Sequence, residues 1–251
     1  MRLNQCLIMA RLQRLAIAST QRQQQQIYLT PSQHHYLIQV LRLTVGDRFL
    51  AILEPGERWL AELSSSQVAL LLEEVEGETE LAVPVTLLAA LPKGQGFDQV
   101  VYQATELGVS RIIPLISDRT LLQPSEQKLE RWRRIVREAT EQSGRLVVPR
   151  IDPPLRFSPA IAAFNPADQQ LYFCTPDPAA PHLADCLADA PFNPIAIMTG
   201  PEGGWTETEM TQAQAAGFQS VSLGQRVLRA VTAPIVALSL VAAHLEQQDP
   251  T

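Results

Sequence analysis

The spacing of apolar and polar positions changes about a third of the way along the 251-residue chain. Before residue 80, short apolar runs alternate with turn signals such as Gly46-Asp47 and Pro55-Gly56, a pattern typical of strands. From Val83 onward, apolar runs of strand length alternate with segments of helical periodicity. The predicted strands are Leu12–Ala18, Arg48–Leu53, Trp59–Leu63, Val68–Val75, Val83–Leu91, Arg111–Ile116, Leu146–Ile151, Leu171–Cys174, Ile195–Thr199 and Ser220–Leu223.

Capping residues mark several helix boundaries. Thr30-Pro31-Ser32-Gln33 fits a capping box with proline at the first helical position, and Thr206 with Glu209 fits a second box. Gly144 follows the end of a strongly amphipathic segment, as expected of a C-terminal cap. The predicted helices are His35–Leu43, Phe97–Leu107, Gln127–Gln142, Pro159–Phe164, His182–Ala190, Glu207–Ala216 and Ala233–Glu246.

The acidic stretch Glu73–Glu80 separates these two patterns and is the expected linker. We therefore predict two domains, residues 1–80 and residues 81–251. Strand–helix alternation in the second predicts an α/β domain whose parallel sheet is covered on both faces. A ligand site is expected at the carboxyl ends of its strands.

Net charge at first argues against a nucleic-acid partner, because the chain carries −6. The charge is unevenly distributed, however. Residues 1–58 hold seven Arg and three acids, and residues 93–156 hold eleven bases and eight acids, whereas residues 59–92 and 157–225 contain no Lys or Arg. Of the 20 bases 18 are Arg, the side chain suited to forked contacts with phosphate. The two basic regions are therefore candidate surfaces for a polyanion.

Three scattered cysteines (Cys6, Cys174 and Cys186) fit neither a disulfide framework nor a zinc site. We expect inert thiols in a reducing compartment, no metal site, and a cytoplasmic protein. The apolar patch Leu7–Ala10 is too short for a signal sequence. The 14 apolar residues Thr232–Leu245 suit a buried helix better than a membrane span.

Two glycine-containing loops carry the clearest candidate chemistry. Ile195–Thr199 runs into Gly200-Pro-Glu-Gly-Gly204, where glycines allow the backbone to approach a ligand closely. The sequence lacks the Gly-Lys-Ser/Thr of a triphosphate loop and the Gly-x-Gly-x-x-Gly of a dinucleotide fold. The second segment, Ser222–Pro234, places Gly224 and two arginines between a strand and a helix. The two loops are expected to lie side by side and to hold a flat adenosine.

Six stretches distributed along the chain form one further pattern. They are His35-x5-Leu41-Arg-Leu-x-x-Gly46-Asp47, Lys93-Gly94, Ala104-Thr-Glu-Leu-Gly108 running to Pro114, Glu138-Ala139 with Glu141-Gln-Ser-Gly-Arg145, Gly200-Pro-Glu-Gly-Gly204 and Leu223-Gly-x-Arg-Val-Leu-Arg229. Together they resemble the ribosomal small subunit methyltransferase E family, 16S rRNA (uracil-N3)-methyltransferases of the SPOUT class. The sequence departs from the family at Val231, where a Glu is usual, and at Gln95-Gly96, where an acidic–basic pair is common.

The resemblance implies an N-terminal PUA-like β-barrel that binds RNA and a SPOUT α/β domain with a deep trefoil knot. It further implies an obligate homodimer that binds S-adenosylmethionine in the knot and methylates a uridine in the decoding region of the small ribosomal subunit. The residues before Met9 are expected to be an extension.

Site roles follow from the same resemblance. The catalytic candidates are Arg145 and Arg229, which would stabilise a uracil anion, and Glu202, which either handles a proton or fixes the glycine loop. The expected cofactor-binding residues are Met198, Thr199, Gly200, Pro201, Glu202, Gly203, Gly204, Leu223, Gly224, Val227 and Leu228, and the expected RNA-binding residues are Arg11, Arg14, Arg42 and Lys93.

Two other functions stay open at this stage. The Val231 departure favours a non-catalytic RNA-binding or ribosome-assembly protein that kept the fold. A SPOUT methyltransferase acting at another RNA position is the second alternative.

The basic first domain generates a prediction about RNA affinity. Arg14→Ala and Arg42→Ala should each weaken RNA binding and flatten its salt dependence, because each removes about one phosphate contact. Affinity for S-adenosylmethionine should not change. Filter binding over a salt series measures the slope, and a slope equal to that of the unaltered protein would contradict phosphate contacts in this domain.

Overall fold

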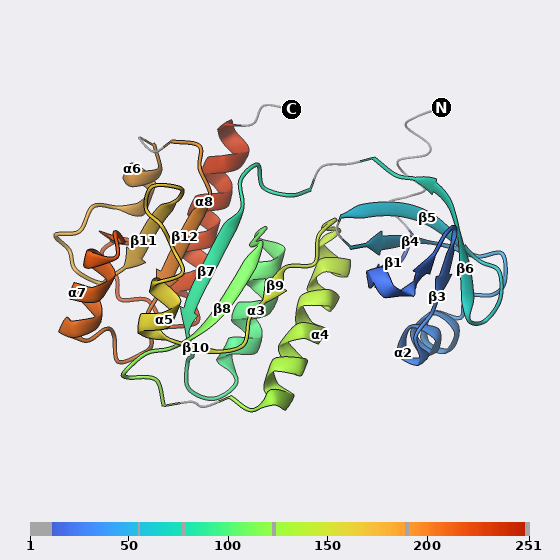
Figure 1. The fold of residues 1–251 in the computed structure, drawn as a ribbon, viewed down its shortest axis with the longest axis horizontal. Coiled ribbons are helices and arrows are strands. Elements are labelled where there is room, and N and C mark those ends of the chain that lie inside the picture. Colours follow the sequence, from blue (N-terminus) through green and yellow to red (C-terminus); the bar gives the residue numbers. More distant parts are fainter. Residues whose placement is uncertain (1–11, 55, 77–78, 122–123, 189–190, 249–251) are drawn as a thin grey trace. The chain divides into compact units, whose positions relative to one another are not determined.

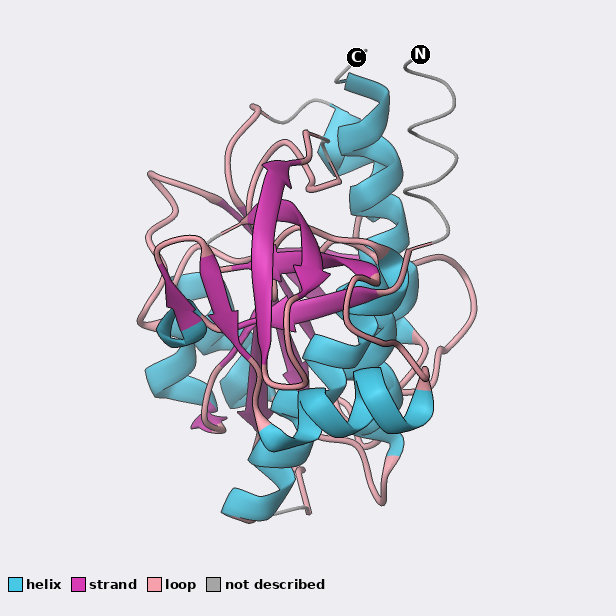
Figure 2. Cartoon of the chain, turned by 90° about the vertical axis from the view of Figure 1, so that its right-hand side faces the viewer, coloured by secondary structure: helices cyan, strands magenta, loops and turns pink. Residues whose placement is uncertain are grey.

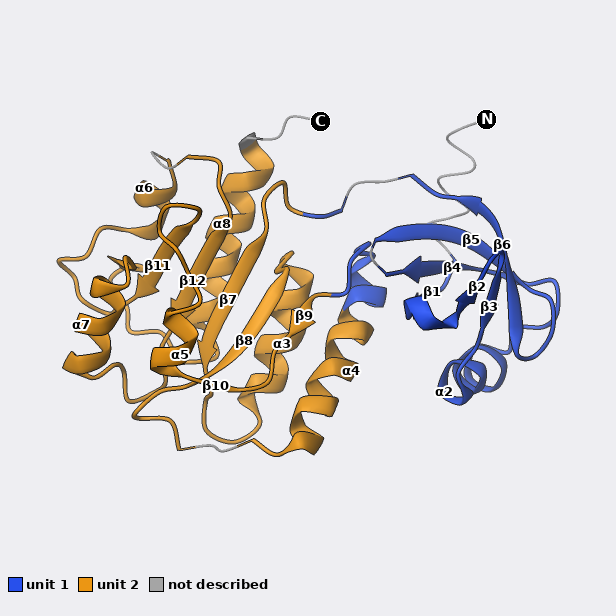
Figure 3. Cartoon of the chain, viewed as in Figure 1, with its two compact units in different colours: residues 1–80, 140–148 blue, residues 81–139, 149–251 orange. Residues whose placement is uncertain are grey.

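The computed structural model describes residues 12–54, 56–76, 79–121, 124–188 and 191–248. Arg11 and the expected extension before Met9 lie outside these ranges. Within the chain two compact units can be distinguished, residues 1–80 with 140–148 and residues 81–139 with 149–251 (Figure 3). The first unit thus ends at Glu80 and also takes in the segment that follows Ala139.

The first unit is built on a six-stranded sheet with the order β1-β4-β5-β6-β3-β2. Figure 2 draws the strands of the chain in magenta. Strands β1 and β4 pair in parallel, and the other neighbours are antiparallel. Side chains such as Ile27, Leu37 and Phe49 are fully buried in its core. Its elements are β1 (Arg14–Ile17), η1 (Ser19–Gln21), β2 (Arg22–Gln23), β3 (Gln26–Tyr28), α2 (Pro31–His34), η2 (His35–Val40), β4 (Arg48–Leu53), β5 (Glu57–Leu63) and β6 (Val68–Glu74).

Strands β2 and β3 were not expected, because their sequence is rich in glutamine. Gln24 adopts a left-handed φ of 55°, which lets the chain turn between them. Ile27 then supplies the one fully buried apolar side chain of β3, and its residue pairs with Ala69 of β6.

The predicted helix His35–Leu43 is corrected by the structure. The capping box forms as expected, with Thr30 N–H donating to Gln33 Oε1 at 2.9 Å. The segment then continues as a π-helix over His35–Val40 and ends at Arg42, whose φ of 59° is left-handed. The N–H of Leu43 turns back to the carbonyl of Leu37, so the chain leaves the helix before Leu43.

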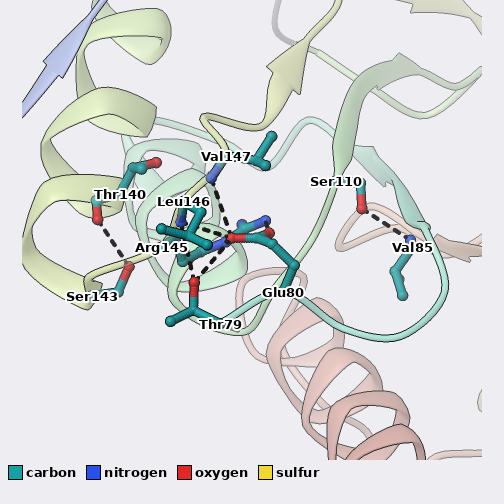
Figure 4. Close-up of polar contacts among 9 residues, drawn as sticks. All are labelled: Thr79, Glu80, Val85, Ser110, Thr140, Ser143, Arg145, Leu146 and Val147. Atoms are coloured by element: carbon teal, nitrogen blue, oxygen red, sulfur yellow. Dashed lines mark hydrogen bonds and ion pairs between the residues drawn. The ribbon is translucent and has the colours of Figure 1, made fainter. Parts of the chain in front are cut away.

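An ion pair between a buried arginine and a half-buried glutamate ties Glu80 of the first unit to the segment after α4 (Glu126–Ser143) (Figure 4). The Arg145 side chain is 3% exposed, and its Nε donates to Glu80 Oε2 at 3.1 Å. Glu80 Oε1 also accepts the N–H groups of Leu146 at 3.0 Å and Val147 at 3.3 Å. The predicted strand Leu146–Ile151 therefore shortens to β9 (Arg150–Ile151), because a carboxylate takes the N–H groups that a strand partner would need.

The second unit is a seven-stranded sheet with the order β10-β8-β7-β12-β11-β13, and β9 also pairs with β8. Each described pair of neighbours is parallel. The elements, with β9 and α4, are β7 (Val85–Ala90), α3 (Gly96–Glu106), β8 (Arg111–Ile116), β10 (Leu155–Arg156), α5 (Phe157–Ile161), β11 (Gln170–Cys174), α6 (Leu183–Ala188), β12 (Ile195–Thr199), α7 (Glu207–Ala215), β13 (Gln219–Val221) and α8 (Ala233–Gln248).

Helices cover both faces of this sheet (Figure 1). Helices α5 and α7 pack on the face that carries Leu88, Ile113 and Met198, and α8 packs with α3 and α6 on the opposite face. Because both faces are covered, the central strands β7 and β12 are largely apolar, and Ile195–Thr199 is buried at every position. Loops at the carboxyl edge are consequently the part of the sheet that is open to ligands.

The Glu80–Arg145 pair predicts a large stability difference between two Arg–Glu pairs of the first unit. Arg145→Met should lower the free energy of unfolding by about 3 kcal/mol, because the carboxylate loses its buried partner. The exposed Arg48–Glu62 pair is the matched control, and Arg48→Met should cost about 0.5 kcal/mol or less. Urea denaturation followed by circular dichroism measures both, and equal costs would contradict the structural role of Arg145.

Candidate active site

A cavity of about 470 Å³ opens at the carboxyl edge of the second unit's sheet. Its walls come from the segments that follow β11, β12 and β13, which are neighbours in the sheet. Strands β11 and β12 are labelled side by side in Figure 1. The lining residues are Cys174, Thr175, Pro176, Gly200, Pro201, Glu202, Gly203, Gly204, Trp205, Leu223, Gly224, Arg226, Val227, Leu228, Arg229, Ala230 and Ala233. Segments far apart in the sequence therefore form one site.

Trp205 determines the course of the glycine-rich loop after β12. Its indole is 7% exposed, stacks on Phe173 with ring centroids 4.9 Å apart, and donates from Nε1 to the Cys174 carbonyl at 3.0 Å. A Cβ on Gly200 would lie 3.0 Å from the same indole, so the close passage of the loop requires glycine. The chain then enters α7 through the Thr206–Glu209 capping box, as predicted.

The second loop turns at Gly224, whose φ of 110° belongs to the region that favours glycine. Ser222 Oγ accepts the Gly224 N–H at 3.1 Å, and the Arg229 carbonyl accepts the N–H groups of Thr232 and Ala233 before α8. Between these two anchors Val227 is 85% exposed. The loop therefore lines the cavity with backbone groups and with the exposed residue Val227.

A third loop, after β7, contacts the first through Glu202. The Lys93 N–H donates to Glu202 Oε1 at 3.0 Å. Val231 lies beside the same segment, because a Cβ on Gly96 would come within 2.6 Å of Val231 Cγ1. Val231 therefore packs against Gly96, and it is not among the residues that line the cavity.

Charges in the wall are few and of both signs. Glu202 is its one carboxylate, and Arg226 and Arg229 are exposed cations at its rim. Burial raises the pKa of the Cys174 thiol to about 12, so this side chain stays protonated near neutral pH and offers no nucleophile. The wall suits a ligand held by backbone groups and positioned by a small number of charges.

The structure brings nine of the predicted cofactor-binding residues together at the cavity: Gly200, Pro201, Glu202, Gly203, Gly204, Leu223, Gly224, Val227 and Leu228. Met198 and Thr199 instead lie buried in β12. Arg229 lines the cavity, and Lys93 reaches it through its hydrogen bond to Glu202.

Arg145, Arg14 and Arg42 belong to the first unit. Arg145 is buried against Glu80 (Figure 4), which is a structural contact, and its catalytic role stays a prediction. The Arg14 guanidinium lies against Gly144, where a Cβ would come within 3.2 Å of it. Arg42 is exposed.

Sequence reasoning missed the contribution of Cys174, Thr175 and Pro176, which follow β11. The signal was present, because a strand that neighbours β12 in a parallel sheet must end at the same edge. It also missed Arg119, whose Nη1 donates to the Gly203 carbonyl at 2.6 Å. An arginine in the loop after β8 has no sequence pattern that would link it to residue 203.

Comparison with known proteins agrees with this arrangement. Residues 79–242 match the model of an RNA methyltransferase domain, and residues 29–70 match that of an RNA methyltransferase PUA domain. A Synechocystis protein named ribosomal RNA small subunit methyltransferase E is 45% identical over 236 residues, which are 93% of this chain and 78% of the relative. The chain belongs to the ribosomal RNA small subunit methyltransferase E family.

Other members of the methyltransferase E family support the assignment. The Bacillus subtilis protein of that name is 29% identical over 87% of this chain and 90% of its own length. A crystal structure of the Neisseria gonorrhoeae member bound to S-adenosyl methionine has a TM-score of 0.82 and 30% identity, covering 92% of this chain and 97% of that one.

Among the residues that the structure describes, no group of three or more His, Cys, Asp or Glu side chains is arranged to hold a metal ion. Within the same ranges, no helix combines the length and apolar character needed to cross a membrane.

Proposed function

We propose that this chain transfers a methyl group from S-adenosylmethionine to N3 of a uridine in 16S rRNA, in the decoding region of the small ribosomal subunit. The observation that carries the proposal is the convergence of the Gly200–Gly204 and Leu223–Arg229 loops on one cavity. Membership of the methyltransferase E family supports the reaction class. A relative whose crystal structure contains S-adenosyl methionine supports the choice of cofactor.

The residues present fit this cofactor. A volume of about 470 Å³ is within the range of small-molecule sites. At Gly224 no heavy atom lies within 4 Å of where a Cβ would be, so the backbone can be approached closely there. We assign the adenosine and methionine parts to the two loops, together with Cys174–Pro176.

When bound, S-adenosylmethionine supplies an electrophilic methyl group. The residues of the chain must then expose the uracil, because N3 is tied up in base pairing, and must hold it in a fixed geometry. N3 loses its proton as it forms the new bond to carbon. Arg229, exposed at the cavity rim, is placed to stabilise the negative charge that develops on the uracil ring.

Glu202 has two roles that its contacts support. Its carboxylate is exposed at the cavity and can accept or direct the N3 proton. The same carboxylate holds the Lys93 N–H, so it also joins two loops of the site. Arg145 pairs with Glu80, and its part in stabilising the uracil anion stays a prediction.

RNA contacts are assigned to exposed cations. Arg42 extends from a backbone in a left-handed conformation, which is uncommon for a residue other than glycine and is typical of functional positions. Lys93 is exposed beside the cavity, and Arg14 is partly exposed. Arg11, which lies outside the described residues, completes the proposed set on the resemblance alone.

Finer features of the architecture belong to the same proposal. We assign residues 1–80 to a PUA-like barrel and residues 81–251 to a SPOUT domain with a trefoil knot. Two copies are proposed to associate through α8, where Ile235, Val236 and Leu240 are only partly buried. An apolar helix with such positions gains stability from further burial.

Val231 favours one alternative, a non-catalytic RNA-binding protein, because the usual Glu is absent. Its packing against Gly96 weakens that argument. Val231 and Gly96, which both depart from the family pattern, are in contact, and the lack of a side chain on Gly96 leaves room for Val231. Methylation at another RNA position stays the second alternative and is decided by the product.

Glu202→Gln separates the two roles of this residue. Glutamine keeps an oxygen acceptor for the Lys93 N–H and loses the charge. The affinity for S-adenosylmethionine should therefore change less than about 3-fold, whereas turnover should fall about 100-fold or more if the carboxylate handles the proton. Calorimetry and single-turnover methyl transfer measure the two quantities. Equal losses in both would assign Glu202 to the loop structure alone.

Nucleoside mass spectrometry tests the proposed function itself. The purified protein is incubated with S-adenosylmethionine and small ribosomal subunits from a strain that lacks the enzyme. We expect 3-methyluridine at one 16S position, and none with subunits that already carry the modification. A different methylated nucleoside would support the other SPOUT specificity, and cofactor-independent RNA binding without methylation would support the non-catalytic alternative.

A further inference from the structure

A buried carboxylate connects the loop after β8 to the start of α7. Glu209 is 2% exposed, and its Oε1 accepts the Asp118 N–H at 2.9 Å while its Oε2 accepts the Thr206 N–H at 2.8 Å. Charge-assisted hydrogen bonds of this kind are among the strong ones in proteins. Residues 118 and 206, which are 88 positions apart, are therefore held at fixed positions around one side chain.

Arg119 follows this anchored residue and lies over the glycine-rich loop. Its Nη1 donates to the Gly203 carbonyl at 2.6 Å. Its aliphatic stem covers the same residue, because a Cβ on Gly203 would lie 3.2 Å from Arg119 Cδ and 3.4 Å from its Cβ. Gly203 lines the cavity, so Arg119 contacts the loop in its wall although Arg119 itself is not a lining residue.

We propose that Arg119 is a positioning residue of the cofactor site, held in place by Glu209, which fixes the Gly200–Gly204 loop in the conformation that binds S-adenosylmethionine. This inference rests on the proposed function, because it takes the cavity as the cofactor site. No sequence pattern pointed to Arg119.

The physical reason is the composition of the loop. Three glycines in five residues give it a large conformational freedom that must be lost on binding. Trp205 restrains one end through Gly200, and Glu202 reaches the loop after β7. The Gly203 carbonyl lies between these restraints, and the cationic donor of Arg119 fixes its direction.

The test compares Arg119→Ala and Arg119→Lys with Arg137→Ala, which removes an exposed arginine from α4 and serves as the control. Arg119 is itself exposed, so its variants should fold with melting temperatures close to that of the unaltered protein. Calorimetry gives the Kd for S-adenosylmethionine. Hydrogen–deuterium exchange of the cofactor-free proteins reports on the peptide that contains Gly200–Thr206.

We expect Arg119→Ala to raise the Kd about 10-fold or more and to speed exchange in that peptide. Arg119→Lys should recover part of both effects, because an ammonium can still donate to the carbonyl. Arg137→Ala should change neither.

The inference would be overturned if the unaltered protein binds the cofactor and Arg119→Ala changes neither the Kd nor the exchange rate. Equal changes in Arg119→Ala and Arg137→Ala would overturn it as well. Failure of the unaltered protein to bind S-adenosylmethionine would instead overturn the proposed function, and the exchange measurement would still decide whether Arg119 restrains the loop.

Discussion

Parallel pairing of the strands in the second unit brings the loops after β7, β8, β11, β12 and β13 to one edge of the sheet. Because helices cover both faces, this edge is where backbone groups are accessible to a ligand. The cavity, its glycine-rich walls and the few charges around it all depend on this arrangement. Neighbouring strands β11 and β12 supply two of its walls, and β13 supplies the third.

Loops at such an edge bury little apolar surface, so specific contacts must hold them. One restraint beside this site is the buried Glu209 carboxylate, which joins the loop after β8 to the start of α7. Trp205 adds a packing restraint, and its indole N–H satisfies the Cys174 carbonyl at the end of β11. Polar contacts therefore hold these loops in place, whereas apolar packing holds the strands of the sheet.

Sequence predicted the second unit best where burial on both faces makes a strand continuously apolar. Arg111–Ile116 and Ile195–Thr199 have the expected bounds for this reason. The glycine-rich loops and the Thr206–Glu209 capping box were also predictable, because each depends on residues that are close in sequence. These local signals were enough to identify most of the cavity wall.

Contacts between distant residues could not be predicted in the same way. The Glu80–Arg145 pair joins residues 65 positions apart, so the contact that the structure gives this candidate catalytic arginine in the first unit could not be read from the sequence. Arg119 reaches Gly203 across 84 positions, and Val231 meets Gly96 only in the folded chain. Strand β3 was missed because partner pairing, rather than its own glutamine-rich sequence, holds it in the sheet.

We propose that the two loops after β12 and β13 together form the S-adenosylmethionine site. Amide chemical-shift mapping of the isotopically labelled protein tests it most directly. On addition of S-adenosylmethionine, the largest shifts should fall on Gly200–Gly204 and Leu223–Ala230, with further shifts at Thr175. Saturable shifts confined to other parts of the chain, with these two loops unaffected, would contradict the account.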